Sequence, residues 1–177
     1  MEALQAYNIR FSGLKNGFHY FDFEIGSDFF NQFDGSLVKN AVLQVALELE
    51  RKTSGLVLQF KLTGWLELPC DRCLKQIQVP VSGDAELVVK LSAEPGESTD
   101  NLWFLPITAY EINVGQFLYE TISLMVPLRV LCRPEDSNSC QADFEALMQQ
   151  YDGSAAKEEE DGDIDPRWEK LKNLKLN

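Results

Sequence analysis

Four cysteines are the residues of this chain whose type and spacing could do chemistry. Cys70 and Cys73 form a Cys-x-x-Cys pair, and this spacing allows two thiolates to bind one tetrahedral metal ion from a tight turn. Cys132 and Cys140 form a looser pair with seven residues between them, and the proline and small polar residues of that gap predict a loop. Four sulfur ligands select zinc or iron–sulfur chemistry over hard ions. We therefore expect all four cysteines to bind one ion, with zinc in a structural role as the leading candidate.

Two other interpretations of the cysteines remain open. A redox dithiol needs a lowered thiol pKa and a partly exposed position at the start of a helix, whereas the first pair lies between two predicted strands. The other interpretation is four separate reduced thiols, packed as small apolar groups or lying in loops. The gap in the second pair keeps it open, because metal-binding pairs usually have about two to four residues between them.

The sequence lacks the features of a catalytic site. A catalytic zinc keeps an open coordination position and commonly uses histidine or carboxylate ligands, but the chain has one histidine. This residue, His19, lies in an alternating segment that predicts an ordinary strand, with no evident partner for catalysis. The sequence also contains no Gly-x-Ser-x-Gly motif and no base that would activate a cysteine. We therefore expect a protein that is not an enzyme.

The composition is that of a folded globular protein, with 45% hydrophobic and 25% charged residues in a chain of 177. That length is near the size of a single domain. The formal net charge is −12, from 16 basic and 28 acidic residues. This balance disfavours a protein that coats nucleic acid, because phosphate binding draws on clustered Lys and Arg side chains. It suits a basic partner, and equally a surface that serves solubility.

The sequence predicts a cytoplasmic protein. No stretch approaches the roughly 18 consecutive apolar residues of a membrane helix, and residues 1–10 lack a basic region followed by an apolar run. In the reducing cytoplasm, thiols stay reduced or bind metal more often than they form structural disulfides. The compartment therefore favours the metal interpretation.

Alternation of apolar and polar residues predicts strands in the first half of the chain, over residues 18–25, 43–50 and 56–62. In residues 43–50 the Ala, Leu and Glu residues also favour helix, and we take the period of two as decisive. The polar residues 52–55 then predict the turn of a hairpin. Gly64 interrupts the pattern and predicts a bulge or a twist point.

A second hairpin is predicted beyond the first cysteine pair. Apolar residues alternate over residues 77–81 and again over residues 85–91, and Ser82 with Gly83 between them predicts the turn. We therefore expect an α+β fold with an antiparallel, strand-rich N-terminal half built from hairpins and followed by helices.

Apolar residues recur at helical spacing in the second half of the chain. The first helix is predicted to begin at Asn113 as its cap, with Gln116 three residues later, and to end at Pro127. Its stripe consists of Val114, Phe117, Leu118, Ile122 and Met125. A further helix has a stripe of Phe144, Leu147, Met148 and Tyr151. We interpret both stripes as core packing and place no site on them.

The composition changes after residue 151. Residues 152–165 contain seven acidic residues and one large apolar residue, and predict a flexible acidic linker. Residues 166–177 predict a short basic amphipathic helix, with Asp165 as cap and Pro166 at its first position. A helix this short is marginal in water, so we expect it to dock on its own domain or on another molecule. Its candidate docking residues are Trp168, Leu171 and Leu174. We expect one domain over residues 1–151, followed by these two segments.

These features together resemble a known family. The stretch of residues 66–74 with its Cys-x-x-Cys pair, the helix end at residues 124–128, the second cysteine pair, the acidic linker and residues 165–171 occur in the order typical of the YceD family of bacterial cytoplasmic proteins. The resemblance covers about residues 60–177 and implies a role in the accumulation or processing of large-subunit ribosomal RNA. It brings no catalytic residues. It implies that the four cysteines are metal ligands and that the final helix is a docking motif.

The resemblance leaves the partner open. The gene of this family often adjoins that of a small basic ribosomal protein, and the acidic charge suits binding of a ribosomal protein or precursor. The alternative is direct RNA binding by a zinc knuckle through Arg72 and Lys75, with Trp65 nearby and the basic tail as a second contact. Arg72 and Lys75 can equally be exposed residues that serve solubility.

Overall fold

The computed structural model describes residues 3–94 and 96–151, and its main element is a five-stranded sheet with the strand order β2-β3-β4-β5-β6. Its strands are β2 (Gly17–Ile25), β3 (Asn40–Lys52), β4 (Gly55–Pro69), β5 (Gln76–Ser92) and β6 (Leu102–Pro106). Strands β2 to β5 pair antiparallel, whereas β6 pairs parallel with the end of β5. The predicted α+β fold, with strands followed by helices, is confirmed, and the sheet is mixed because of β6.

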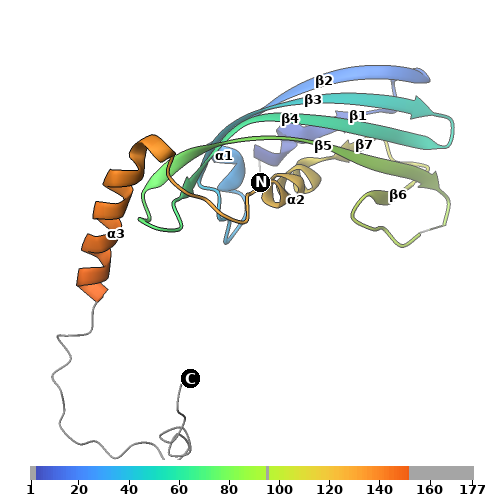
Figure 1. Ribbon diagram of the computed structural model, residues 1–177. Coiled ribbons are helices and arrows are strands. Elements are labelled where there is room, and N and C mark those ends of the chain that lie inside the picture. Colours follow the sequence, from blue (N-terminus) through green and yellow to red (C-terminus); the bar gives the residue numbers. More distant parts are fainter. Residues whose placement is uncertain (1–2, 95, 152–177) are drawn as a thin grey trace, which may run out of the picture.

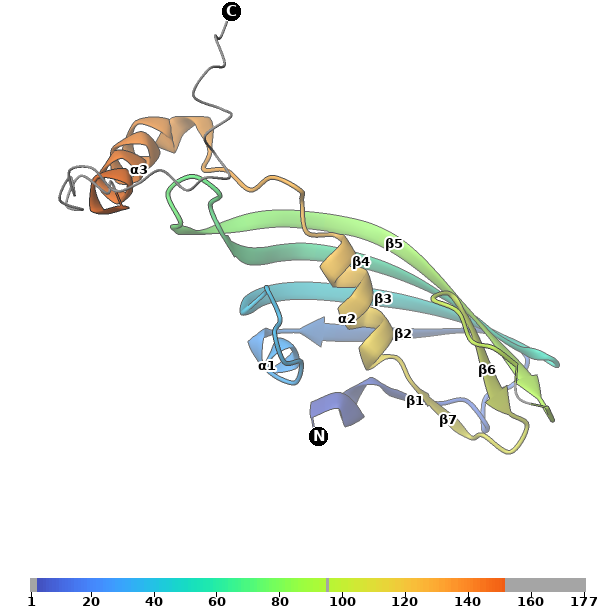
Figure 2. The ribbon, with the colours of Figure 1, turned by 90° about the horizontal axis from the view of Figure 1, so that it is seen from below.

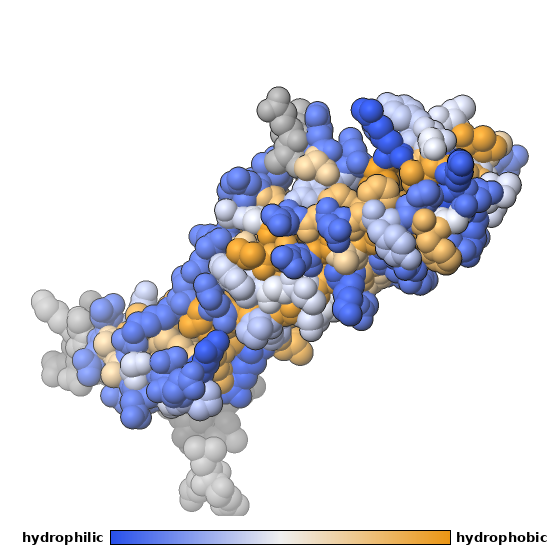
Figure 3. All heavy atoms as spheres, turned by 90° about the horizontal axis from the view of Figure 1, so that it is seen from above, coloured by the Kyte–Doolittle hydropathy of each residue, from blue (hydrophilic) through white to orange (hydrophobic). Residues whose placement is uncertain are grey.

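One face of this sheet is covered and the other is open (Figures 1 and 2). The covering elements are η1 (Ala3–Tyr7), α1 (Ser27–Phe30), α2 (Gly115–Leu124) and a small sheet of β1 (Asn8–Arg10) with β7 (Glu111–Asn113). The core lies between these elements and the sheet, where Phe117 of α2 packs over Phe60 of β4 with 5.2 Å between ring centroids. On the open face, hydrophilic side chains are interspersed with apolar patches (Figure 3).

Strand β3 confirms the assignment of residues 43–50. Its side chains alternate between buried and more exposed along nearly the whole strand, from buried Ala41 to buried Leu49. Because β3 has hydrogen-bonded neighbours on both sides, the sheet outweighs the helical propensity of its Ala, Leu and Glu residues. The predicted turn is also confirmed, since Lys52 pairs with Gly55 across a two-residue connection.

The predicted second hairpin is wrong. Strand β5 runs without interruption from Gln76 to Ser92, and Ser82 and Gly83 pair with Thr63 and Leu62 of β4. Gly83 lies beneath Met125, where an added Cβ atom would approach the Met125 Cε atom to 3.3 Å. Glycine at this position therefore leaves room for the end of α2 on the sheet and does not make a turn.

A bulge or a twist point was predicted at Gly64, and the bulge is wrong, because the register between β3 and β4 continues unbroken across it. Gly64 nevertheless has a φ of +154°, a conformation that other residues rarely adopt. A Cβ atom at this position would lie 2.1 Å from the carbonyl oxygen of Val42. The glycine thus allows a close approach of two backbones within a continuous pairing.

Helix α2 confirms the first predicted helix. The Asn113 side chain accepts a hydrogen bond from the Gly115 backbone N–H at 2.9 Å, although the residue at the N-cap position is Val114. Phe117, Leu118 and Ile122 are buried against the sheet, as their spacing predicts. The helix ends at Leu124, three residues before Pro127.

The second predicted helix is α3 (Ser137–Tyr151), which follows a short 3₁₀ turn, η2 (Pro134–Asp136). Its existence is as predicted, but the expected core packing of its stripe is wrong, since Cys140 is its one buried residue. The reason is its position, because α3 projects beyond the end of the sheet (Figure 1). None of the helices in residues 3–94 and 96–151 is long and apolar enough to cross a membrane. The predicted linker, residues 152–165, and the predicted terminal helix, residues 166–177, lie outside the described residues.

We expect Gly64→Ala to lower the free energy of unfolding by at least about 2 kcal/mol, because the new methyl group meets the Val42 carbonyl in a backbone conformation unsuited to alanine. The midpoint of urea unfolding measures this change. Gly13→Ala is the matched control, because a Cβ atom at Gly13 has nothing within 4 Å. Equal midpoints for the two variants would contradict the role assigned to Gly64.

Candidate metal centre

The first cysteine pair forms the turn between β4 and β5. Strand β4 ends at Pro69, and the Cys70 N–H donates to the Lys75 carbonyl at 2.8 Å while the Leu74 N–H donates to the Cys70 carbonyl at 2.9 Å. Leu74 has a φ of +60°, so the turn closes in a left-handed conformation that costs free energy for a leucine. The turn directs both thiols inward, since Cys70 and Cys73 are buried.

The second pair comes from the segment after α2. Cys132 is partly exposed in the connection that follows α2, and Cys140 is buried in the first turn of α3. The prediction that a loop carries both residues is therefore wrong for Cys140. The 3₁₀ turn that starts at Pro134 leads directly into α3, so the polar residues of the gap begin a helix.

The four sulfur atoms converge at the end of the sheet. All of them lie within 4.8 Å of one another, with 3.9 Å between Cys70 Sγ and Cys140 Sγ and 3.6 Å between Cys73 Sγ and Cys132 Sγ. A disulfide would need about 2.05 Å. Four sulfurs at about 2.3 Å from a tetrahedral zinc ion lie about 3.8 Å apart. The donor set and its spacing therefore fit one zinc ion.

The electrostatic environment differs between the sulfurs. Burial raises the pKa of the Cys70 thiol, but hydrogen bonds from the backbone N–H groups of Cys73, Arg72 and Cys132 outweigh burial and lower that pKa to about 6. Burial raises the pKa of Cys132 and Cys140, and the neighbouring sulfurs contribute further. A metal ion would supply the positive charge that three or four adjacent thiolates require.

Contacts outside the sulfurs join the turn to the α2–α3 segment. The Asp71 N–H donates to the Val130 carbonyl at 2.8 Å, and the Val130 N–H donates to Asp71 Oδ2 at 2.6 Å. Lys75 forms an ion pair with Asp143 of α3, and this contact raises the pKa of Lys75. These contacts position the two cysteine pairs relative to each other. Sequence reasoning missed Asp71 and Asp143, and only the position of Asp71 inside the Cys-x-x-Cys pair could have indicated it.

Of the other predicted site residues, the structure describes Arg72 and Lys75 but not those near the C-terminus. Arg72 is half-buried beside the cysteines, and no ion pair of its side chain occurs within residues 3–94 and 96–151. Lys75 is exposed but paired with Asp143, which reduces its availability to a phosphate. Trp168, Leu171 and Leu174 lie outside the described residues.

The arrangement fits a structural metal better than redox chemistry or catalysis. A reactive redox thiolate is partly exposed, whereas Cys70 has 0% exposure. Four sulfurs fill a tetrahedral site and leave no open position for substrate. His19 is on β2, where its Nε2 atom lies 2.8 Å from the Lys15 carbonyl. The cysteine cluster therefore suits a structural role, in which it joins the turn between β4 and β5 to the segment that carries Cys132 and Cys140.

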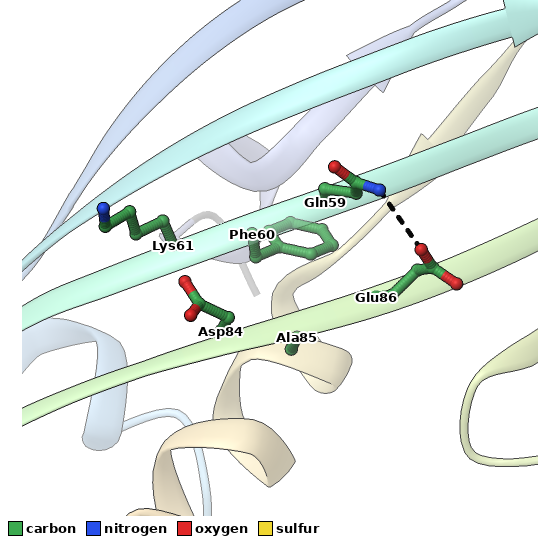
Figure 4. A pocket seen from close by; sticks show the side chains of 6 residues that line it. All are labelled: Gln59, Phe60, Lys61, Asp84, Ala85 and Glu86. Atoms are coloured by element: carbon green, nitrogen blue, oxygen red, sulfur yellow. Dashed lines mark hydrogen bonds between the residues drawn. The ribbon is translucent and has the colours of Figure 1, made fainter.

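A shallow hollow on the open sheet face offers no second centre. It encloses about 460 Å³ and is lined on that face by Gln59, Lys61, Asp84 and Glu86 (Figure 4). Gln59 donates to Glu86 at 3.2 Å, a cross-strand contact that stabilises the pairing of β4 with β5. These side chains form an ordinary polar sheet surface.

We expect elemental analysis of protein purified without added metal to find about one zinc ion per chain. Cys70→Ser and Cys132→Ser should each lower the zinc content well below that of the wild type, because each removes one of four ligands. Asn138→Ser, in the same segment but with an exposed side chain, should retain the metal. A sub-stoichiometric wild type would contradict the metal assignment.

After removal of the metal under reducing conditions, we expect one thiolate per chain to form near pH 6, because backbone N–H groups stabilise the ionised Cys70. The absorbance of thiolate at about 240 nm against pH measures this titration. Below that pH the thiol is protonated and the signal is lost. Cys70→Ser should remove this step. A wild type with no step below pH 8 would contradict the assignment to Cys70.

Comparison with known proteins identifies the chain. A family model described as "Large ribosomal RNA subunit accumulation protein YceD" matches residues 58–175, which include the four cysteines and α3. Searches of curated proteins and of solved structures found no match. The matched range covers well over half of the chain, from β4 onward. The chain therefore belongs to the YceD family.

Proposed function

We propose that this protein is a non-enzymatic cytoplasmic factor that supports accumulation and processing of large-subunit ribosomal RNA by binding a ribosomal protein or precursor during ribosome assembly. The observation that carries this proposal is the family match, whose description links the family to accumulation of the large ribosomal RNA subunit and names no enzymatic activity.

Zinc has a structural role in this proposal. The proposed ion is bound by the turn between β4 and β5 together with Cys132 and Cys140. It thus stabilises the position of α3 against the end of the sheet. Structural zinc sites in small domains contribute on the order of 10 kcal/mol to folding, so loss of the ion would release α3 from the sheet.

The charge of the surface supports a basic protein as the partner. The open sheet face carries exposed carboxylates on two strands, Asp22 and Glu24 of β2 with Asp84 and Glu86 of β5. These side chains attract basic segments and repel phosphate groups. The engagement of Lys75 by Asp143 further weakens the case for direct RNA binding beside the cysteines.

We expect the full chain to bind at least one purified basic protein of the large ribosomal subunit, when these proteins are titrated one at a time by fluorescence anisotropy. Affinity should fall about tenfold or more between about 50 mM and about 300 mM salt, because screening weakens attraction between opposite charges. Deletion of residues 166–177 should reduce the affinity. Replacement of Asn173 and Asn177 by serine is the control for the deletion and should leave binding unchanged.

Two results would contradict this proposal. One is binding that is absent or insensitive to salt. The other is retention of large-subunit RNA fragments on filters that is lost in Arg72→Ala and Lys75→Ala variants, since this result would make RNA the direct partner.

A further inference from the structure

Helix α3 has an apolar stripe that continues from the metal centre into solvent. The stripe begins at Cys140, which is buried with the other sulfurs, and recurs at helical spacing through Phe144, Leu147, Met148 and Tyr151. Phe144 and Leu147 are partly buried, whereas Met148 is 53% exposed and Tyr151 is 80% exposed. Within residues 3–94 and 96–151, none of these last four residues packs against the core.

This exposure is unusual for an amphipathic helix. Such helices normally bury their apolar stripe, and an exposed apolar row marks a binding surface. Figures 1 and 2 show α3 projecting from one end of the sheet, away from α1 and α2. Its first turn is attached through Cys140 and the Asp143–Lys75 ion pair, whereas its last two turns extend beyond those contacts. The stripe therefore needs a partner that the sheet cannot supply.

We propose that residues 166–177 of the same chain dock as a helix on this stripe, so that α3 and the C-terminal segment form a helical hairpin attached to the metal centre. The segment has the complementary pattern, with Trp168, Leu171 and Leu174 at three-residue spacing after the start signal of Asp165 and Pro166. A helix of 12 residues is marginal alone in water, so contact with α3 would stabilise it.

Charge favours this pairing. Helix α3 contains Asp143 and Glu145 and no basic residue. Residues 166–177 contain one acidic residue and four basic ones, which are Arg167, Lys170, Lys172 and Lys175. Opposite charges beside an apolar contact stabilise a helix pair and select its partner.

The length of the connection favours the same chain over a second copy. Residues 152–165 span up to about 46 Å when extended, whereas α3, with 15 residues, is about 22 Å long. The segment can therefore turn back along the whole stripe. A tether of this kind gives an effective concentration in the millimolar range, far above the micromolar concentration of a second copy. Weak helix contacts are then sufficient within one chain.

Docking of residues 166–177 on α3 does not depend on which molecule the protein binds. A fall in partner affinity on deletion of residues 166–177 would then follow from loss of the α3 hairpin, and exchange in the free protein tests the docking separately. The docking assigns the stripe of α3 to the chain itself and gives Trp168, Leu171 and Leu174 an intramolecular contact. It also makes the attachment of α3 through Cys140 the basis for the position of the C-terminal segment.

Hydrogen–deuterium exchange of the full chain tests the inference, with a synthetic peptide of residues 166–177 as the reference. We expect the backbone amides of residues 168–176 to exchange about tenfold or more slowly in the protein than in the peptide. Met148→Glu should remove most of this protection, because it places a carboxylate within the apolar contact. The side chain of Met148 is more than half exposed, so the substitution spares the core, and an unchanged zinc content confirms an intact domain.

Gln149→Glu is the matched control, since it adds the same charge on the opposite side of α3 and should leave the protection intact. Exchange of the segment at the rate of the peptide would overturn the inference. So would protection that survives Met148→Glu. Protection that disappears on dilution from about 100 μM to about 1 μM would assign the contact to a second copy and would equally overturn it.

Discussion

The convergence of four sulfur atoms at one end of the sheet is the constraint on which the second half of the molecule depends. These atoms join the turn between β4 and β5 to the connection after α2 and to the first turn of α3. Each element reaches this point beyond the main core, where few apolar contacts are available to secure it. Four uncoordinated thiols contribute little by packing, whereas four thiolates around one ion bind these segments strongly.

The sheet brings the sulfurs within reach of each other. Strands β4 and β5 pair over fifteen residues, so their turn extends to the end of the sheet that α3 occupies. Helix α2 packs on the covered face and ends near Gly83, which directs the following segment toward the same turn. Asp71 and Val130 then exchange two hydrogen bonds, and this contact sets Cys132 beside Cys73. The backbone thus preorganises the ligands before any ion binds.

This architecture separates two surfaces with different chemistry. The open sheet face carries exposed carboxylates together with exposed apolar side chains such as Phe18 and Val42. The stripe of α3 is apolar and lies beyond the sheet. Membership of the YceD family links the molecule to large-subunit ribosomal RNA, and the carboxylates of the open face make the proposed contact with a ribosomal protein electrostatically favourable. The family match covers both the four cysteines and α3.

The sequence by itself determined the fold class, most strands, the two longer described helices α2 and α3, and the four cysteines, because alternation, helical spacing and cysteine pairs are local patterns. The short helix α1 was not predicted. The prediction of a turn at Ser82 and Gly83 was wrong, and the sequence held a signal against it. A two-residue turn there would have paired Val79 with Glu86, and so placed Ile77 and Val79 on the face opposite to that of Leu87. Only the tertiary structure decided that Gly83 accommodates Met125, that Cys140 lies on a helix and that Met148 and Tyr151 at the end of the α3 stripe are exposed. It also decided the convergence of sulfurs up to seventy positions apart. The physical reason is that these outcomes depend on where the sheet ends and on which segments meet there, and neither is encoded in the local period of residues.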